Sequence, residues 1–188
     1  MHKKIVNVLS LFFIAGLSIS SYGGRFGVSG FLGYYSVNDS IYKETYGNGN
    51  LMYGGSISLG IATKLEVRAG VYYFQDLGAM TFTEEEIKFV FIPLDLSLRY
   101  KIIETNRLSP YIGAGIDLCF YKESLPERFQ EVSETAVGFH AEVGTYVRLF
   151  RGFHLDINAR YLKADVEPYE ERIGLGGFRV GIGLEYRF

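Results

Sequence analysis

The last eleven residues of the chain alternate between two kinds of side chain. Apolar residues occupy every second position from Phe178 to Phe188, and small or charged residues stand between them, from Arg179 to Arg187. This two-residue period is typical of a β-strand with one apolar face. In a soluble sandwich that face points into the core. In an outer-membrane barrel it points outward to lipid, and the charged residues fill the interior.

Seven earlier segments repeat this alternation, so we expect eight strands in all. They cover residues 25–37, 51–62, 65–73, 94–101, 110–121, 137–148, 153–161 and 178–188. Segments of about ten residues with a dyad repeat are the expected signal of a transmembrane barrel, and eight in series make that signal strong. In the fourth segment the apolar parity changes near Pro93. We expect a β-bulge there, because proline cannot donate to the ladder.

The connections between these segments alternate in length. The long ones cover residues 38–50, 75–86, 122–135 and 163–173, and the short ones cover 63–64, 102–109 and 150–152. Outer-membrane barrels have short periplasmic turns and longer outer loops. The order therefore predicts an all-β, eight-stranded antiparallel up-and-down transmembrane β-barrel with both termini on the periplasmic side.

The N-terminus has the pattern of a signal peptide. Lys3 and Lys4 precede an apolar stretch from Ile5 to Ile19, and small residues follow at the positions that a signal peptidase recognises. We expect a signal peptide over residues 1–21 and a barrel domain over 22–188, with a short membrane anchor as the alternative. No later apolar run is long enough for a membrane-spanning helix, so a mature membrane protein must be a barrel.

The composition agrees with a barrel of this kind. Aromatic residues make up 16% of the chain, with 15 Tyr, 15 Phe and no Trp. Tyr and Phe must then form the aromatic girdles that outer-membrane barrels place at the two lipid–water interfaces. The formal net charge of −2 argues against a nucleic-acid partner.

Three stretches carry a resemblance to a known family: residues 92–100, 109–116 and 184–188. With them the chain resembles the small outer-membrane β-barrel domain proteins of Gram-negative bacteria, akin to the OmpA, OmpX and OmpW barrels. The resemblance implies an outer-membrane location after Sec export, with periplasmic chaperones and the barrel-assembly machinery as partners. It also implies that Phe188 and Tyr186 belong to an assembly signal.

Charged residues of both signs lie at the inward positions. We expect a network that fills the lumen, made of Arg68, Asp95, Arg99, Asp117, Glu142, Asp156, Arg160, Arg179 and Glu185, with Glu66 and Arg187 also inward. An eight-stranded barrel is only wide enough for its side chains to fill it, so these charges must pair. The alternative, an ion-conducting lumen, more plausibly shows an excess of one sign.

The sixth and seventh segments predict one pair directly. A tight hairpin near Arg151 places Glu142 opposite Arg160, Tyr146 opposite Asp156, and Arg148 opposite His154. Directly opposite residues lie about 5 Å apart, which allows an interior ion pair between Glu142 and Arg160.

No catalytic, metal or cofactor site is expected. His140 and His154 point inward without further convergent ligands, and Ser124 and Ser133 lie in a loop. Cys119 is the single cysteine, and we expect it to be an inert interior thiol. Acidic groups lie in the long connections. They form a solvated surface, or bind divalent cations that bridge to lipopolysaccharide phosphates, or bind a cationic partner. They are Glu84, Glu85 and Glu86; Glu123, Glu127, Glu131 and Glu134; and Glu167, Glu170 and Glu171.

We therefore expect a non-enzymatic, monomeric outer-membrane barrel with a plugged polar lumen, which stabilises the envelope or presents surface loops among lipid and lipopolysaccharide. Two alternatives remain. One is a barrel that passes small or apolar solutes, as the OmpW resemblance suggests. The other is a soluble, lipocalin-like periplasmic barrel that turns its Val, Leu and Ile residues inward.

Overall fold

The computed structural model describes residues 26–79, 86–124, 132–166 and 173–188. The predicted signal peptide over residues 1–21 lies outside this part of the chain. Eight long strands form the barrel: β1 (Phe26–Val37), β2 (Asn50–Gly60), β3 (Leu65–Ala79), β4 (Glu86–Lys101), β5 (Leu108–Ser124), β6 (Val132–Phe150), β7 (Phe153–Lys163) and β10 (Gly177–Arg187). A separate two-stranded sheet consists of β8 (Asp165–Val166) and β9 (Ile173–Gly174).

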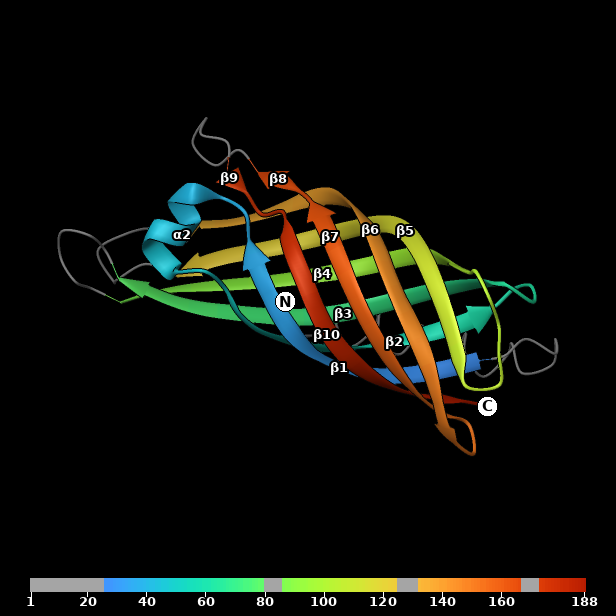
Figure 1. The fold of residues 1–188 in the computed structure, drawn as a ribbon. Coiled ribbons are helices and arrows are strands. Elements are labelled where there is room, and N and C mark those ends of the chain that lie inside the picture. Colours follow the sequence, from blue (N-terminus) through green and yellow to red (C-terminus); the bar gives the residue numbers. More distant parts are fainter. Residues whose placement is uncertain (1–25, 80–85, 125–131, 167–172) are drawn as a thin grey trace, which may run out of the picture.

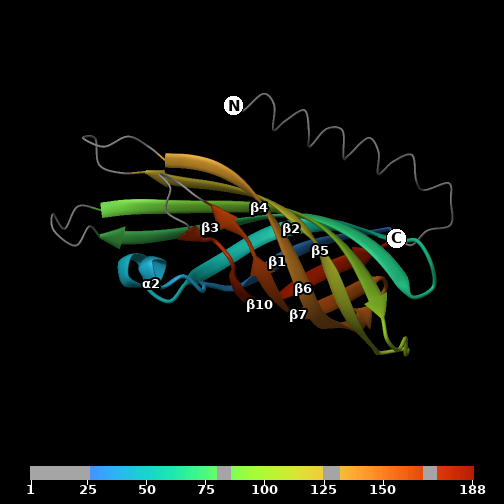
Figure 2. The same cartoon turned by 90° about the horizontal axis from the view of Figure 1, so that it is seen from above.

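The eight long strands close into one antiparallel barrel (Figure 1). Each strand pairs with its neighbours in the chain, and β10 closes the wall by pairing with β1, with Gly27 opposite Arg187 and Val37 opposite Gly177. The backbone N–H of Phe188 also donates to the carbonyl of Phe26, at 2.9 Å. Both ends of the barrel wall thus lie beside the short turns (Figure 2). The predicted eight-stranded up-and-down barrel is confirmed.

The apolar faces of the strands point outward. On β10, Phe178, Val180, Ile182, Leu184 and Tyr186 are all exposed, whereas Arg179 and Glu185 between them are buried. The same alternation holds around the wall, with most Val, Leu and Ile residues outside and charged, small or aromatic residues inside. A soluble lipocalin-like barrel has the opposite arrangement, so this alternative is wrong.

Outward-facing aromatic rings, most of them exposed and three (Phe26, Tyr73 and Phe153) half-buried, gather at two levels of the outer surface. The level nearer the long connections contains Tyr34, Tyr53, Tyr73, Phe120, Phe139, Tyr161 and Phe178. The level nearer the short turns contains Phe26, Tyr100, Phe150, Phe153, Tyr186 and Phe188. On β10 the two levels are eight residues apart, about 20 Å along the axis of a barrel with strands tilted by roughly 40°. This spacing approaches the apolar band of about 25 Å in outer-membrane barrels, and Tyr and Phe alone form the girdles.

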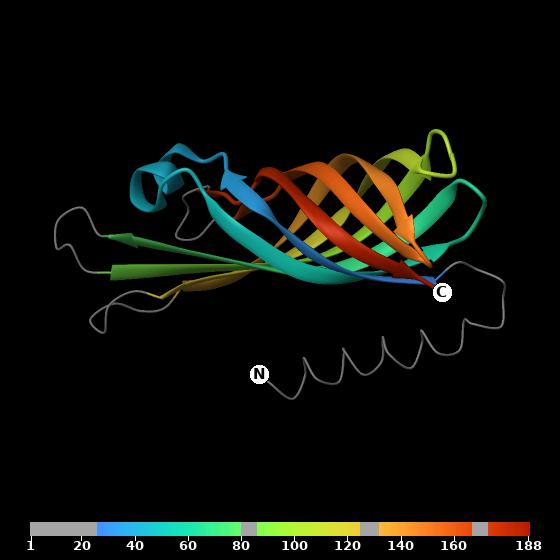
Figure 3. The same ribbon diagram turned by 60° about the horizontal axis from the view of Figure 1, so that its bottom comes forward.

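Four strands are longer than the sequence predicts. β3 to β6 contain 15–19 residues each, whereas β1, β2, β7 and β10 contain 11 or 12. They project beyond the other four as a curved blade (Figure 3). The predicted loops 75–86 and 122–135 are therefore partly wrong, because strands occupy much of both. The blade is stable because its inner face carries aromatic residues that pack together, including Phe89 and Tyr121 at 5.5 Å between ring centres.

The predicted bulge at Pro93 is also wrong. The register between β4 and β5 is constant from Lys88 opposite Ser124 to Lys101 opposite Tyr111. The apolar parity changes because Phe89, Phe91 and Pro93 point inward, as do Asp95 and Arg99 further along. The interior lining changes in character at this level. The ladder to β3 has a gap at Ile92 and Pro93, but its register is the same on both sides of that gap.

The hairpin between β6 and β7 has the predicted register. Glu142 lies opposite Arg160, Tyr146 opposite Asp156, and Arg148 opposite His154. Arg151 and Gly152 have positive φ angles of 34° and 86°, as a tight two-residue hairpin turn requires. A register shift between Arg148 and Phe150 lies directly before the turn.

A short helix within the first long connection was not predicted. α2 (Ser40–Tyr46) begins after Asp39, whose carboxylate accepts the backbone N–H of Tyr42 at 3.1 Å, as an N-cap does. It ends at Gly47, which has a φ angle of 91°. Among the described residues, no helix is long and apolar enough to cross a membrane.

The outward face of β10 leads to a first prediction. Ile182 is 52% exposed and lies midway between the two girdles, so Ile182→Arg places a charge near the bilayer midplane. We expect a loss of about 2–4 kcal/mol in the free energy of unfolding, against about 0–1 kcal/mol for Phe178→Arg at the girdle. Urea unfolding in phospholipid vesicles, followed by circular dichroism, measures both. Equal losses for the two variants would contradict the assignment of the membrane band.

Candidate functional site

The filled interior of the barrel is the candidate functional site, and it has two halves. The half beside the short turns holds buried charges, and the half beside the long connections holds aromatic and apolar side chains. The ionic half contains the residues predicted from the sequence for the lumen network. The aromatic half was not predicted.

Arg99 of β4 lies at the centre of the ionic half and is 0% exposed. Its Nε and Nη2 donate to the two carboxylate oxygens of Glu142, at 2.6 and 3.0 Å, in a bidentate pair. Its Nη1 donates to the hydroxyl of Tyr146 at 2.6 Å and to Oδ2 of Asp156 at 3.1 Å. Bidentate guanidinium–carboxylate pairs are among the stronger hydrogen-bonded contacts in proteins. Arg99 thereby joins β4 to β6 and β7.

The predicted pair between Arg160 and Glu142 is present. Nη2 of Arg160 donates to Oε2 of Glu142 at 2.9 Å, so Glu142 binds two guanidinium groups at once. Nη1 of Arg160 forms an ion pair with Asp95 and lies 3.7 Å from Oδ1 of Asp117. Asp117 in turn contacts Nδ1 of His140. All these side chains are buried. Removal of one charge would therefore leave its partner as an uncompensated charge in the interior.

The carboxylate of Asp156 on β7 accepts hydrogen bonds from side chains of three other strands. Arg68 of β3 donates to Oδ2 at 2.8 Å, Arg99 of β4 shares the same oxygen, and the hydroxyl of Tyr111 of β5 donates to Oδ1 at 2.7 Å. Arg68 also reaches Oγ of Ser29 at 3.1 Å. These contacts cross the interior between strands that are not neighbours in the wall. The tyrosines were missed as members of the network, although their inward parity is visible in the sequence.

A third group lies closest to the short turns. Arg187 donates to Oε1 of Glu185 at 2.8 Å and to Oε2 of Glu66 at 3.1 Å. Glu185 also accepts the hydroxyl of Ser58 at 2.9 Å, and Glu66 accepts that of Tyr146 at 2.5 Å. The network therefore continues from the centre to the barrel end.

The interior charges of the ionic half, all buried except that of the half-buried Arg187, balance among the described residues. Six carboxylates (Glu66, Asp95, Asp117, Glu142, Asp156 and Glu185) face six cations (Arg68, Arg99, Lys101, Arg160, Arg179 and Arg187). Five of the cations have a carboxylate partner. The exception is Arg179, which lies between the rings of Phe31 and Tyr72 with its guanidinium carbon 4.3 Å from each ring centre.

The aromatic half consists of rings in mutual contact. Tyr35 of β1 packs edge-on against Phe74 and stacks on Phe91, at 5.3 and 5.7 Å between ring centres. Its hydroxyl donates to the carbonyl of Leu175 at 2.7 Å. Phe89 continues the cluster toward the blade. The signal in the sequence was a run of apolar residues on both parities of β4.

α2 covers this half with two tyrosines. Tyr42 packs on Phe89 at 5.0 Å and donates to Oδ2 of Asp76 at 3.0 Å, and Tyr46 donates to Glu123. Burial is the main cause that raises the pKa of both tyrosines well above the usual value, and the adjacent carboxylates add to it. Both hydroxyls therefore stay protonated as donors at physiological pH. Glu123 is thus engaged inside the barrel; most of the other predicted acidic clusters lie outside the described residues.

The two histidines and the cysteine of the barrel have separate surroundings in the described part of the chain. His140 and His154 are not brought together, since His140 contacts Asp117 and Nδ1 of His154 lies 3.0 Å from the carbonyl of Gly152. No cluster of three possible metal ligands occurs among the described residues. Cys119 is buried in the aromatic half, inside the barrel as predicted.

The shared role of Glu142 leads to a second prediction. Glu142→Gln removes the charge that faces both Arg99 and Arg160, and leaves two buried guanidiniums short of a partner. We expect a loss of about 3–5 kcal/mol in the free energy of unfolding. Lys163→Gln, an exposed outward position, is the control and should change stability by about 0.5 kcal/mol or less. Urea unfolding in vesicles tests this, and similar effects for both variants would contradict an interior ionic network.

The comparisons with known proteins agree with this architecture. The structure resembles the outer membrane protein OprG from Pseudomonas aeruginosa, with a TM-score of 0.71 and 16% identity over 88% of this chain and 96% of that chain. It also resembles Neisserial surface protein A, with a TM-score of 0.67 and 16% identity over 88% and 99%. A third similar structure is Ail, the attachment invasion locus protein of Yersinia pestis, with a TM-score of 0.58 and 13% identity over 88% and 99%. At these identities the likeness concerns the fold.

The sequence itself supplies the family. No curated protein matches it. Residues 6–188 match the family described as outer membrane protein beta-barrel domain. The chain therefore belongs to the outer membrane protein beta-barrel domain family, whose place is the outer membrane of Gram-negative bacteria.

Proposed function

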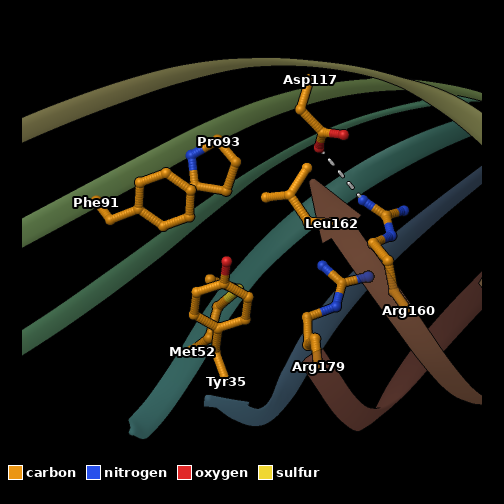
Figure 4. A pocket seen from close by; sticks show the side chains of 8 residues that line it. All are labelled: Tyr35, Met52, Phe91, Pro93, Asp117, Arg160, Leu162 and Arg179. Atoms are coloured by element: carbon orange, nitrogen blue, oxygen red, sulfur yellow. Dashed lines mark ion pairs between the residues drawn. The ribbon is translucent and has the colours of Figure 1, made fainter. Parts of the chain in front are cut away.

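We propose that this protein is a closed structural barrel of the outer membrane, which catalyses no reaction, conducts no solute and holds its outer connections at the cell surface. The observation that carries the proposal is the filled interior, with a balanced ionic half and an aromatic half in series. A cavity between them (Figure 4) amounts to about 10 Å³, roughly the space of one water molecule.

Charge balance also argues against an ion path. A pore selective for one ion concentrates one sign of charge along its wall. Here the six buried carboxylates are matched by six cations, and the bonds of Arg99 and Arg160 occupy the centre of the cross-section. An ion that entered would have to break several buried pairs.

We also propose that the outer rim contacts lipopolysaccharide. Lys88, Lys122 and Lys163 point outward at or beyond the aromatic girdle nearer the long connections, where the phosphates of that lipid lie. Acidic residues at the same end of the barrel, among them Asp76 of β3 and Glu123 of β5, point inward. This separation of charge favours direct contact between the lysines and anionic head groups. This contact acts in addition to the divalent cations that we expect the acidic loops to bind.

Passage of small apolar solutes remains the second candidate, and one observation favours it: the outer half of the interior is apolar and lies under the short helix α2. A solute could enter only after α2 and the rings of Tyr35 and Phe91 had moved, and the ionic half would still block the route to the periplasm. The closed barrel requires no such rearrangement.

Bilayer recordings test the closed barrel. Purified protein refolded into a planar lipid bilayer should show no steady open level, because side chains fill both halves of the interior. A porin of known conductance in the same bilayer is the positive control. A reproducible open level, or uptake of a small apolar solute by protein-containing vesicles faster than by empty ones, would contradict the proposal and favour transport.

The C-terminal residue leads to a further prediction, which concerns export and assembly. We propose that segment 1–21 directs Sec export and is removed, and that periplasmic chaperones and the assembly machinery then deliver the chain as a monomer. Phe188 lies on the outward face and contacts Phe26 and Tyr186, at 5.8 and 4.9 Å between ring centres.

Deletion of Phe188 should lower the amount of folded, heat-modifiable barrel in outer-membrane fractions several-fold. Phe188→Tyr keeps an aromatic ring at the same place and should assemble normally. Semi-native gel electrophoresis of membrane fractions measures both. Wild-type amounts of folded barrel from the deletion variant would refute an assembly role for this residue.

A further inference from the structure

The end of the barrel with the short turns carries exposed positive charge. These turns join β2 to β3, β4 to β5 and β6 to β7, and they lie beside the C-terminus, at the end opposite α2 (Figure 1). Four exposed basic residues, which we call the rim cations, belong to this end: Lys64, Arg107, Arg148 and Arg151. None of them forms an ion pair with a carboxylate among the described residues, unlike most cations of the interior.

Acidic groups at the same end do not balance the rim cations. The interior charges there pair with one another, as Arg187 does with Glu66 at 3.1 Å. Besides these, the described acidic groups of this end are the side chain of Glu104 and the terminal carboxylate of Phe188. Four cations against two carboxylates leave a net charge of +2. A positive potential at this end of the barrel attracts anions.

Two of the rim cations are held beside each other. The backbone N–H of Arg148 donates to the carbonyl of Arg107 at 2.8 Å, which continues the ladder beyond Leu108 and Val147. Directly opposite residues share one face of the sheet with their Cβ atoms about 5 Å apart, and like charges there repel. The wall ends at this level and both side chains are exposed, so their long stems reach the head-group region. An anion between the two guanidinium groups removes the repulsion.

Apolar side chains place this end of the barrel at the membrane surface. Ile61, Ile102 and Phe150, next to the turns, are 45–62% exposed. The side chain of Lys64 lies among them. Its Nζ donates to the carbonyl of Ile102 at 3.4 Å and lies 5.9 Å from the ring centre of Tyr100, a member of the aromatic girdle. Girdle rings lie at the level of the lipid head groups, so this ammonium lies at the depth of the lipid phosphates.

We propose that the rim cations bind the phosphate groups of anionic phospholipids, with phosphatidylglycerol as the model, in the leaflet that the short turns face. A phosphate matches the charge and the forked donors of a guanidinium group. The apolar residues beside the cations favour a lipid over a water-soluble polymer, because they contact acyl chains while the cations contact the head group. The surface therefore selects anionic over zwitterionic lipid, independent of whether the barrel conducts.

Competition between two lipids tests the proposal. The mature chain, folded in detergent micelles, is mixed with equal amounts of phosphatidylglycerol and phosphatidylcholine that have identical acyl chains. Native mass spectrometry measures the ratio of the two lipids that stay bound. We expect phosphatidylglycerol to be enriched about fivefold, the ratio that corresponds to one basic residue near an anionic lipid. Salt at about 1 M, where the Debye length is about 3 Å, should remove most of this enrichment.

Variants assign the enrichment to this end of the barrel. The rim variant replaces all four rim cations with Gln and should bind both lipids equally. A matched pair compares one exposed lysine from each end: Lys64→Gln should lower the enrichment, whereas Lys43→Gln in α2 should leave it unchanged. Should the rim variant fail to fold, the matched pair decides.

Three results would overturn the proposal. They are equal binding of both lipids by the wild type, wild-type enrichment in the rim variant or in Lys64→Gln, and an equal loss in Lys64→Gln and Lys43→Gln. Binding to purified peptidoglycan that depends on the rim cations, without any lipid enrichment, would also refute it and would assign this surface to the cell wall.

Discussion

Charge pairing across a narrow interior is the constraint on which this barrel depends. Eight strands enclose only enough space for their own side chains, so inward charges need partners on other strands, and among the described cations of the ionic half only Arg179 packs between rings instead. Glu142 of β6 satisfies arginines from β4 and β7, and Asp156 of β7 satisfies arginines from β3 and β4. The pairs hold only in one strand order and one register. A slip by one residue would turn these charges toward lipid and bring apolar side chains inside.

The aromatic half solves a different problem. Beyond the girdle nearer the long connections the wall is incomplete, because β3 to β6 continue as a blade while the other strands end. Ionic pairs there would be open to water and would contribute little. Rings bury a large apolar area and need few hydrogen bonds, and their hydroxyls reach the rim, as Tyr42 reaches Asp76. Packed rings under α2 therefore close the end that the sheet leaves open.

Alternation along each strand predicts the wall well, because the two-residue period is a local property of the chain. It assigns the faces of all eight strands, and the tight turn at Arg151 fixes the register that puts Glu142 opposite Arg160. The partners of Arg99 are not predictable in this way. Glu142 and Asp156 lie on β6 and β7, and the positions of these strands along the barrel axis relative to β4 depend on the tilt and shear of the closed barrel. At Pro93 alternation alone predicts a bulge, because it cannot distinguish an interior lined by rings from a change of register. The helix α2 was missed despite its caps, Asp39 and Gly47, because seven residues give little periodicity.

Two classes of contact therefore stabilise the barrel at different stages of its closure. Hairpin contacts such as Glu142 with Arg160 join neighbouring strands and are available to an open sheet. Contacts such as Arg68 with Asp156, or Arg187 with Glu66, join strands on different sides of the interior and exist only once the sheet has curled. An open sheet would hold these charges unpaired and would expose two strand edges. The network thus penalises the open form and stabilises the closed one, so the same residues that fill the lumen also make closure between β1 and β10 cooperative.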